Sequence, residues 1–396
     1  MKNRNLKKIS VIGGAGRVGF PFSMVLASIG MSVEIIDTDE KKLNLIKKGE
    51  SPYIEYGIEQ ILNKIKKFDL SYSTNFENVN QSDIVILTIG TPIDEYLNPD
   101  YKSFFATLET LLNFLKKDQL LILRSTLFPG TSKKIDQIIK KRKLNLKLAY
   151  CPERISQGNC LNEITNLPQI ISGNSKLAIK EAEIFFKKIT NKTVLLNFEE
   201  AELSKLFSNS WRYIKFAIAN QFYTICEDNN LSFEKIRDAM VMDYERARDL
   251  PKSGFSAGPC LFKDTMQLSA YSRDKFTLGH SSMLTNESLP NFLVNKLKSK
   301  KSINRKKVGI LGMAFKPNND DTRDSLAYKL KKILINEGAY VFCSDIHIND
   351  NTFIDSKSLI NKCDIIFIGC PHSDYKNIKF KKNQTIIDCW GFISKS

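Results

Sequence analysis

Short apolar runs alternate with helical patterns along the first 150 residues, and this alternation limits the fold more than any other feature of the chain. The runs, rich in β-branched residues, are Ile9–Ile12, Val33–Ile36, Ile84–Thr88, Leu120–Leu123 and Leu148–Tyr150. Helical patterns such as Pro21–Ser28 and Lys41–Lys48 lie between them. Such alternation is typical of a parallel sheet covered on both faces. We therefore expect an α/β protein.

Near residue 198 the pattern changes to one long helical stretch. Glu199 to Glu227 contain no Gly or Pro, and apolar residues recur there at helical spacing, beginning with Leu203, Phe207 and Trp211. A helix of this kind is about 40 Å long and serves as a structural spine or a dimer seam. Strand-like runs then return at Val308–Leu311, Tyr340–Cys343, Ile365–Ile368 and Thr385–Ile387. We expect three domains, at residues 1–197, 198–300 and 301–396.

The composition excludes several classes of protein. A hydrophobic fraction of 42% and a charged fraction of 26% are those of a folded chain. No apolar run reaches the roughly 18 residues of a membrane span, and the basic N-terminus leads straight into a strand, so we expect no membrane partner and no signal peptide. Eight Cys without a CxxC pair and only three His favour a reducing, cytoplasmic setting without a metal site.

The formal net charge of +16 admits a nucleic-acid binder as one explanation. Lysines, however, are scattered through the whole chain. Only Lys296 to Lys307 is densely basic, and it lacks the interleaved aromatic residues on which bases stack. A weakly attractive field for a small polyanion explains the charge equally well, and we expect no nucleic-acid partner.

A glycine-rich turn lies between the first strand and the first helix. Gly14-Ala15-Gly16-Arg17-Val18-Gly19 has the spacing and context of a dinucleotide-binding turn, in which glycines let a pyrophosphate approach the helix N-terminus. Asp37 closes the second strand, 18 residues after Gly19, where a carboxylate takes ribose hydroxyls and repels a 2′-phosphate. A purely structural turn is the alternative. The pattern favours NAD, with Gly14, Gly16, Arg17, Val18, Gly19 and Asp37 as its binding residues.

Two loops follow other strands of the same predicted sheet. Thr91-Pro92 follows the strand at Ile84, and Ser125-Thr126 follows Leu120–Leu123. Ligands of open α/β sheets lie at the C-terminal ends of strands. Each loop alone is compatible with ordinary turn chemistry, but their shared rim favours a cofactor role for both.

The segment Gly258-Pro259-Cys260-Leu261-Phe262-Lys263-Asp264 is the most informative heptapeptide. Gly-Pro is typical of a helix start, which places Cys260 in the first turn, where the helix dipole favours a thiolate. Lys263 and Asp264 share its face. A thiol beside an ammonium and a carboxylate suits covalent chemistry on a carbonyl, although a buried structural cysteine fits the spacing equally well.

Three further polar residues are candidates, each with a plain alternative. Lys205 and Asn209 are four residues apart on the long helix, on a face separate from its apolar stripe. A lysine aimed into a cleft stabilises an oxyanion, whereas most such residues are simply solvated. Glu153 follows the last strand of the first sheet and is otherwise a surface carboxylate.

Together these pieces resemble the UDP-glucose/GDP-mannose dehydrogenase family, the nucleotide-sugar 6-dehydrogenases, over nearly the whole chain. Besides the glycine turn, the resemblance rests on Ser125-Thr126 with Pro129-Gly130-Thr131, Cys151-Pro152-Glu153-Arg154, Lys205 with Asn209, Gly258 to Asp264, Phe315 to Arg323, and His372 as a lesser match. It implies Rossmann-like N- and C-terminal domains around a central long-helix domain that carries the catalytic Cys. It also implies a homodimer formed through that helix.

The resemblance also implies a reaction. The C6 alcohol of a sugar nucleotide is oxidised to a carboxylate with two NAD in turn, and Cys260 captures the aldehyde as a thiohemiacetal that becomes a thioester. Lys205 would stabilise the oxyanions, and Asp264 would move protons through water. Glu153 would assist hydrolysis of the thioester.

Further residues receive roles from the same resemblance. Thr126 and Asn209 would position the hydrolytic water, and Lys263 and Arg323 would contact the cofactor. The C-terminal domain would bind the nucleotide sugar. The substrate-binding residues implied are Glu153, Arg154, Lys205, Asn209, Arg246, Gly258, Cys260, Phe315 and Lys316.

The chain departs from the family pattern at several positions. An extra Gly13 precedes the turn, Arg17 replaces a common Tyr, and Pro259 replaces a Ser or His. Residues 243–257 match the family pattern poorly; members supply an Arg there, and Arg246 is the nearest equivalent. Residues 388–391 lack the Arg that UDP-glucose members have near that position. Pro-Glu-Arg at residues 152–154 favours a UDP-N-acetylhexosamine such as UDP-N-acetylmannosamine, with UDP-glucose second and GDP-mannose third.

Two other functions stay open. The divergent stretch at residues 243–257 suits a non-catalytic member that holds a nucleotide without turnover. A two-electron NAD-dependent hydroxyacid dehydrogenase of similar architecture would not need Cys260 and would form one NADH per substrate.

Overall fold

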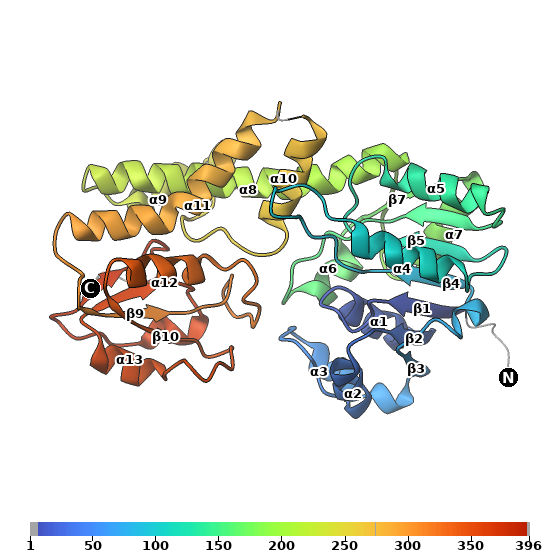
Figure 1. Ribbon diagram of the computed structural model, residues 1–396, viewed down its shortest axis with the longest axis horizontal. Helices are drawn as coiled ribbons and strands as arrows, with labels where there is room; N and C mark the ends of the chain where they lie inside the picture. Colours follow the sequence, from blue (N-terminus) through green and yellow to red (C-terminus); the bar gives the residue numbers. More distant parts are fainter. Residues whose placement is uncertain (1–6, 274, 394–396) are drawn as a thin grey trace. The chain divides into compact units, whose positions relative to one another are not determined.

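The computed structural model of the protein describes residues 7–273 and 275–393, and the chain forms two compact units, Met1–Phe207 and Ser208–Ser396. The first unit is built on an eight-stranded sheet of order β3-β2-β1-β4-β5-β6-β7-β8 (Figure 1). Its strands are β1 (Lys8–Ile12), β2 (Ser32–Ile36), β3 (Leu70–Ser73), β4 (Ile84–Leu87), β5 (Leu120–Leu123), β6 (Lys147–Tyr150), β7 (Gln169–Gly173) and β8 (Thr193–Leu195).

Helices cover both faces of this sheet. One core contains residues of α1 (Gly19–Ser28), α2 (Glu40–Lys48), α3 (Ile58–Leu62), α6 (Cys160–Asn166) and α7 (Lys176–Phe186). The opposite core contains residues of α4 (Lys102–Leu112), α5 (Thr131–Lys141) and the start of α8 (Phe198–Asp228). Strand residues alternate between them: Ile9 and Val11 join the first core and Ile12 the second. Because both faces are covered, the central strands β4 and β5 are apolar throughout, which confirms the predicted α/β fold.

Three strands of this sheet are absent from the predicted set. The edge strands β3 and β8 are partly exposed; β3 alternates apolar and polar residues, and β8 has only three residues. β7 pairs antiparallel with β6, whereas every other neighbouring pair is parallel. The parallel sheet is therefore confirmed through β6 and is extended by a reversed strand.

The second unit contains a parallel four-stranded sheet of order β10-β9-β11-β12. Its strands are β9 (Lys307–Leu311), β10 (Tyr340–Ser344), β11 (Ile365–Ile368) and β12 (Thr385–Ile387). The accompanying helices are α9 (Phe233–Val241), α10 (Leu261–Tyr271), α11 (Thr277–Lys298), α12 (Leu326–Asn336) and α13 (Ser356–Lys362). One core joins α8, α11 and α12 to the central strands β9 and β11, and the four strands confirm the predicted C-terminal α/β fold.

The helix α8 has 31 residues, about 46 Å at 1.5 Å per residue, and it buries polar as well as apolar side chains. Glu202, Lys205 and Asn209 are 0%, 7% and 6% exposed. Large apolar side chains are exposed instead, and we call them the apolar stripe: Phe207, Trp211, Ile218, Phe222 and Ile225. At 100° per residue the stripe spans about 60° and lies opposite the buried polar residues.

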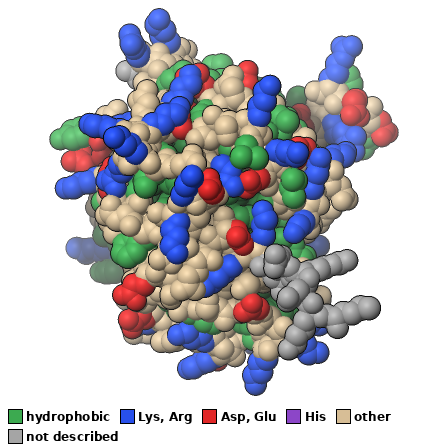
Figure 2. Space-filling view, turned by 90° about the vertical axis from the view of Figure 1, so that its right-hand side faces the viewer, with side chains coloured by type: hydrophobic (Ala, Val, Ile, Leu, Met, Phe, Trp, Pro, Cys, Tyr) green, Lys and Arg blue, Asp and Glu red, His purple; other side chains and the backbone are tan. Residues whose placement is uncertain are grey.

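On the face drawn in Figure 2, lysine and arginine lie singly among acidic and neutral residues. Among the helices of residues 7–273 and 275–393, none combines the length and the apolar character needed to cross a bilayer.

Gly19 is expected to tolerate no larger residue. A Cβ there would lie 2.1 Å from the carbonyl oxygen of Gly13 and 2.8 Å from Cα of Gly14. Since the contacts are with backbone, we expect Gly19→Ala to lower the free energy of unfolding by about 1–3 kcal/mol, measured by denaturant unfolding. Gly90→Ala is the matched control, because a Cβ at Gly90 meets no atom within 4 Å. Equal stability of the two variants would contradict the steric argument.

Candidate active site

The glycine turn lies at the C-terminal end of β1, beside the end of β2. The N–H groups of Gly13 and Gly14 donate to the Ile36 carbonyl oxygen at 2.9 and 3.0 Å. A Cβ at Gly14 would lie 2.6 Å from the Val11 carbonyl oxygen, so the turn requires glycine there. Val18 caps α1 without a side-chain hydrogen bond, and the first turn of α1 has no acidic residue. The helix N-terminus can therefore receive an anion at close range.

Asp37 lies next to this turn, as its place after β2 predicts. Its Oδ2 accepts from the N–H of Ala15 at 3.0 Å, and its Oδ1 accepts from the N–H of Asp39 at 3.0 Å. The guanidinium carbon of Arg17 lies 4.3 Å from the ring centre of Tyr53. An anion site, a cradle that a Cβ would fill and a half-buried acid after β2 are the features that fit NAD.

The loops after β4 and β5 are tied to each other by side-chain hydroxyls. Thr91 Oγ1 donates to the Thr126 carbonyl oxygen at 2.8 Å, and Ser125 Oγ donates to the Ile89 carbonyl oxygen at 2.6 Å. Pro92, in the first loop, accepts from the N–H of Asp100 at 2.9 Å. β1, β4 and β5 are adjacent parallel strands, so both loops share one rim with the glycine turn.

Glu202 is a residue of this region that the sequence reasoning missed. It is completely buried, and its carboxylate accepts from the N–H groups of Gly130 and Ser132 at 2.6 and 2.7 Å, at the start of α5. Burial raises the pKa of the Glu202 carboxyl, against the lowering effect of these hydrogen bonds. The available signal was its spacing of three residues before Lys205, which places both on one face of α8.

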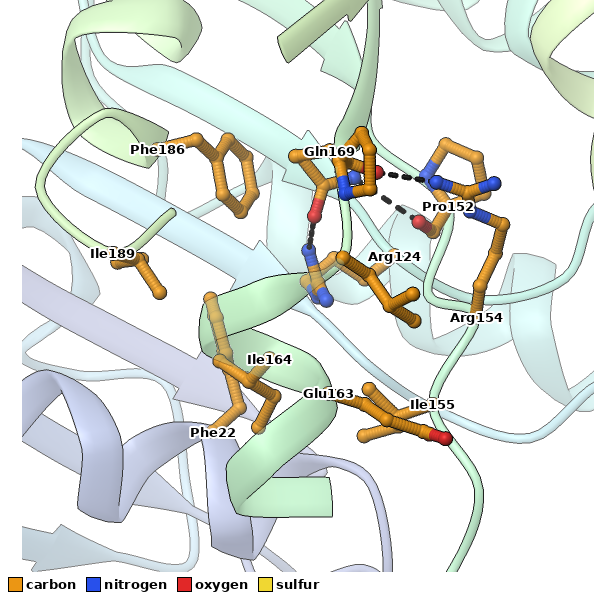
Figure 3. Close-up of a pocket in the computed structure, with 12 residues that line it drawn as sticks. Phe22, Arg124, Pro152, Arg154, Ile155, Glu163, Ile164, Gln169, Phe186 and Ile189 are labelled. Atoms are coloured by element: carbon orange, nitrogen blue, oxygen red, sulfur yellow. Dashed lines mark hydrogen bonds between the residues drawn. The ribbon is translucent and has the colours of Figure 1, made fainter. Parts of the chain in front are cut away.

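Glu153 follows β6 and is 7% exposed, so it is not the surface carboxylate of the plain alternative. Two guanidinium groups act on it: burial lowers the pKa of Arg124 and of Arg154, and the charge of Glu153 opposes both shifts. The side chain of Arg154 donates to the carbonyl oxygen of Pro168 (Figure 3). Both arginines therefore lie within the first unit, close to the loop that carries Glu153.

Asp264 is the centre of a polar cluster in the second unit. No part of it is exposed; its Oδ2 accepts from Asn209 Nδ2 at 2.6 Å, and its Oδ1 accepts from the ammonium group of Lys263. Its N–H donates to the Cys260 carbonyl oxygen at 2.9 Å. The structure thus brings together four residues that the sequence reasoning had assigned to one site.

Cys260 is the N-cap residue of α10 and is exposed, one position before the first helical turn where the sequence placed it. All eight cysteines lie in the described part of the chain, and the other seven are buried. Burial raises the pKa of those thiols, to about 12 for Cys151 and about 11 for Cys343 and Cys363. It also raises the pKa of Cys160, Cys226, Cys370 and Cys389. Cys260 is therefore the exposed cysteine of the chain, and it lies at a helix N-terminus.

Gly258 brings the Cys260 loop against the segment Phe315 to Arg323. Its φ is +103°, and a Cβ on it would lie 2.4 Å from the Phe315 ring. Its N–H donates to the Asp324 carbonyl oxygen at 3.4 Å. Arg323 pairs with Asp321, with 2.7 Å between Nη2 and Oδ2. Phe315 and half-buried Lys316 therefore lie on the segment that packs against this loop.

Arg246 is not joined to this cluster. It is exposed on the short 3-10 turn Glu245–Ala247. Within residues 7–273 and 275–393, no hydrogen bond or ion pair links it to the Cys260 loop.

His372 supports the segment that contains Phe315. The ring is fully buried; its Nδ1 accepts from the N–H of Asn318 at 2.9 Å, and its Nε2 lies 3.0 Å from Asp345 Oδ2. Since Nδ1 accepts a hydrogen bond, the ring is assigned as neutral with its proton on Nε2, which donates to Asp345. Asp345 also accepts from the N–H groups of Met313 and Ala314 at 2.6 and 3.0 Å. This histidine, a lesser match in the sequence, holds the loop in place.

Comparison with known proteins covers almost the whole chain. Models of the UDP-glucose/GDP-mannose dehydrogenase family match it as the NAD binding domain at residues 7–190, the central domain at 199–287 and the UDP binding domain at 309–395. A UDP-N-acetyl-D-mannosamine dehydrogenase of Methanococcus maripaludis is 30% identical over 392 residues, covering 95% of this chain and 89% of the relative. A UDP-glucose 6-dehydrogenase of Bacillus subtilis is 27% identical, covering 86% and 76%. The solved structure of a UDP-D-ManNAc dehydrogenase from Pyrococcus horikoshii has the same fold, with a TM-score of 0.91 at 24% identity over 98% of this chain and 96% of that one.

Alkylation should single out Cys260. We expect iodoacetamide at pH 7.5 to modify one thiol per folded chain, because burial shields the other seven and keeps them protonated. Peptide mass spectrometry identifies the modified residue, and Cys260→Ser should abolish the rapid alkylation. A second cysteine that reacts at a similar rate in the folded protein would contradict this assignment.

Proposed function

Because the chain belongs to the UDP-glucose/GDP-mannose dehydrogenase family, we propose that it oxidises the C6 hydroxyl of a UDP-sugar to a carboxylate with NAD as the oxidant. The observation that carries the proposal is the exposed Cys260 at the start of α10, one turn before the buried Asp264. A two-electron dehydrogenase needs no such thiol. A four-electron oxidation needs a group that retains the aldehyde between its two halves.

The covalent role of Cys260 follows from the electron count. NAD, when bound, supplies the oxidant for both two-electron steps. The alcohol becomes an aldehyde, and Sγ of Cys260 adds to its carbon to form a thiohemiacetal. Loss of two more electrons gives a thioester, and water then displaces the sulfur as carboxylate forms. Each alcohol consumes one water and two NAD and releases two NADH and three protons.

The polar cluster around Asp264 suits the acid–base steps. We assign proton movement through water to Asp264. Asn209 would hold that water through its amide oxygen, because its Nδ2 already donates to Asp264. The ammonium group of Lys263 donates one proton to Asp264 and has two others that could hydrogen-bond to the cofactor. Lys205, buried on the polar face of α8, would stabilise the oxyanions.

Hydrolysis of the thioester is assigned to Glu153. Its buried position at the end of β6 supports a role in activating water. Thr126, half-buried at the rim of the same sheet, would help to position that water.

The nucleotide sugar would bind beside Phe315 and Lys316, which lie in the matched UDP binding domain. Gly258 supports this, since its contact with Phe315 joins the cysteine loop to that domain. Arg323 would reach the cofactor from the same segment. Arg154 and Arg246 complete the proposed set; Arg154 has N–H donors beyond the one given to the carbonyl oxygen of Pro168.

We propose UDP-N-acetylmannosamine as the sugar nucleotide. The Pro-Glu-Arg sequence at residues 152–154 supports it, as do the names of several relatives, among them that of Methanococcus maripaludis. With saturating NAD, this substrate should give two NADH per sugar at a higher kcat/KM than UDP-glucose or GDP-mannose. Absorbance of NADH and mass spectrometry of the uronate product are the measurements.

Cysteine variants test the covalent step in the same assay. Cys260→Ser and Cys260→Ala should lose acid formation by orders of magnitude, because the thioester cannot form. If each substrate gives one NADH and Cys260→Ser forms NADH at the wild-type rate, the protein is instead the two-electron hydroxyacid dehydrogenase. Thermal stabilisation by UDP-sugars without any NADH would indicate the non-catalytic binding member.

The proposed domain plan gives residues 1–197 to the cofactor, 198–300 to Cys260 and dimerisation, and 301–396 to the nucleotide sugar. We place the protein in the cytoplasm, where thiols stay reduced. The scattered lysines and arginines (Figure 2) support attraction of an anionic sugar nucleotide rather than of a nucleic acid.

The apolar stripe of α8 supports a homodimer, because monomers rarely expose so many large apolar side chains along one helix. Trp211→Glu, in the middle of the stripe, should shift the mass measured by light scattering from dimer to monomer. Lys141→Glu, a charge change at an exposed position on α5, should leave the dimer intact. A monomeric wild-type protein at micromolar concentration would overturn this assembly.

A further inference from the structure

Arg124 is a buried charge that the proposed chemistry does not use. It follows β5 and is 4% exposed, and its guanidinium carbon lies 4.3 Å from the ring centre of Phe22 and 5.3 Å from that of Phe186. A desolvated cation is costly unless hydrogen bonds and opposite charges surround it. Its partners therefore indicate what it does.

The hydrogen bonds of Arg124 lead to the loop that ends in Glu153. Nη1 donates to Gln169 Oε1 at 2.9 Å and, in a longer contact of 3.5 Å, to the Cys151 carbonyl oxygen. Gln169 in turn donates through Nε2 to the Pro152 carbonyl oxygen at 3.1 Å (Figure 3). Together Arg124 and Gln169 hold the carbonyl groups of both residues that precede Glu153.

The cavity beside Arg124 is too small to be an anion site. Its lining includes Phe22, Arg154, Glu163 and Gln169, and its volume is about 20 Å³. That volume admits a water molecule but not a phosphate. Nε of Arg124 has no hydrogen-bond partner among the described residues, so one water in this cavity would satisfy it.

Charge connects Arg124 to Glu153 as well. Burial lowers the pKa of Arg124, and the negative charge of Glu153 opposes that shift. Arginine stays protonated in proteins, so a permanent cation is buried near a carboxylate that is itself 7% exposed. The attraction acts in the same direction as the two carbonyl contacts, because all three hold the Glu153 loop against β5 and β7.

We propose that Arg124 and Gln169 are positioning residues for hydrolysis of the Cys260 thioester: they fix the backbone of Cys151 and Pro152 and so hold Glu153 in place. The inference rests on the proposed function, because it takes from it the hydrolytic role of Glu153. Neither residue needs to touch the substrate. Water still displaces the sulfur, and the thiol of Cys260 is still regenerated.

Arg124→Met and Gln169→Leu test the proposal, because both keep most of the side-chain volume and remove the hydrogen bonds. With NAD and UDP-N-acetylmannosamine as the probe, we expect the first turnover to release two NADH per active site within about threefold of the wild-type rate. Steady-state turnover should fall about 10- to 100-fold, the effect of a small misplacement of a reacting group. Intact mass spectrometry after acid quenching should show the uronyl nucleotide on Cys260, and hydroxylamine should release it.

Matched variants separate positioning from general damage. Ile164→Val removes a methyl group from the lining of the same cavity and leaves both carbonyl contacts in place. This variant should be less stable but should not accumulate the thioester. Glu153→Gln should accumulate the same adduct as the two test variants. Arg124→Lys keeps the charge and should recover part of the hydrolysis rate. If Arg124→Met does not fold, Gln169→Leu tests the proposal by itself. This variant removes the hydrogen bond to the Pro152 carbonyl oxygen and keeps the donor to the Cys151 carbonyl oxygen.

The negative outcomes are distinguishable. Arg124→Met or Gln169→Leu could instead slow NADH release in the first turnover and form no adduct. That result would overturn the inference and leave the two residues a structural role. Absence of the adduct in Glu153→Gln, while Cys260 stays essential, would remove the hydrolytic role of Glu153 and this inference with it. Full turnover by Cys260→Ser would overturn the proposed function itself.

Discussion

The carboxylate of Asp264 has no contact with solvent, and the arrangement around Cys260 depends on how that buried charge is compensated. Removing a carboxylate from water costs several kcal/mol unless a charge and hydrogen bonds replace the solvent. Lys263 supplies the charge from the next position in the chain, and Asn209 supplies a hydrogen bond from α8. The acid thereby fixes α10 against α8, and with it the helix start where Cys260 is exposed.

The same physical device recurs at the ends of strands. Loop backbone has no sheet partner, and its buried N–H and C=O groups must be satisfied by side chains. Glu202 accepts from two N–H groups at the start of α5, and Arg124 with Gln169 donates to two carbonyl groups after β6. Asp345 accepts from the N–H groups that follow β9. Buried polar and charged side chains thus give these loops their shape.

The parallel part of the first sheet resembles the second sheet, but an acid in the same position has different surroundings. Asp37 after β2 is half-buried and accepts from two backbone N–H groups. The side chain of Asp345 after β10 is completely enclosed and accepts from three backbone N–H groups and from His372. The enclosed side chain of Asp345 is not accessible to a ribose. The two acids therefore differ in their access to a ligand, and the first sheet is the one matched as an NAD binding domain.

The order of strands and helices, the glycine turn and the helix start at Cys260 could be predicted from the sequence, because periodicity and backbone sterics act over a few neighbouring residues. β3 was not predicted because its apolar and polar residues alternate, and β7 and β8 were not predicted because their apolar runs are short. The exposure of Cys260, the burial of Glu202, Lys205 and Asn209 on α8, and the contact of Arg124 with Gln169 across 45 positions depend on tertiary packing. Burial and charge pairing are set by groups far apart in the chain, and no local pattern encodes them.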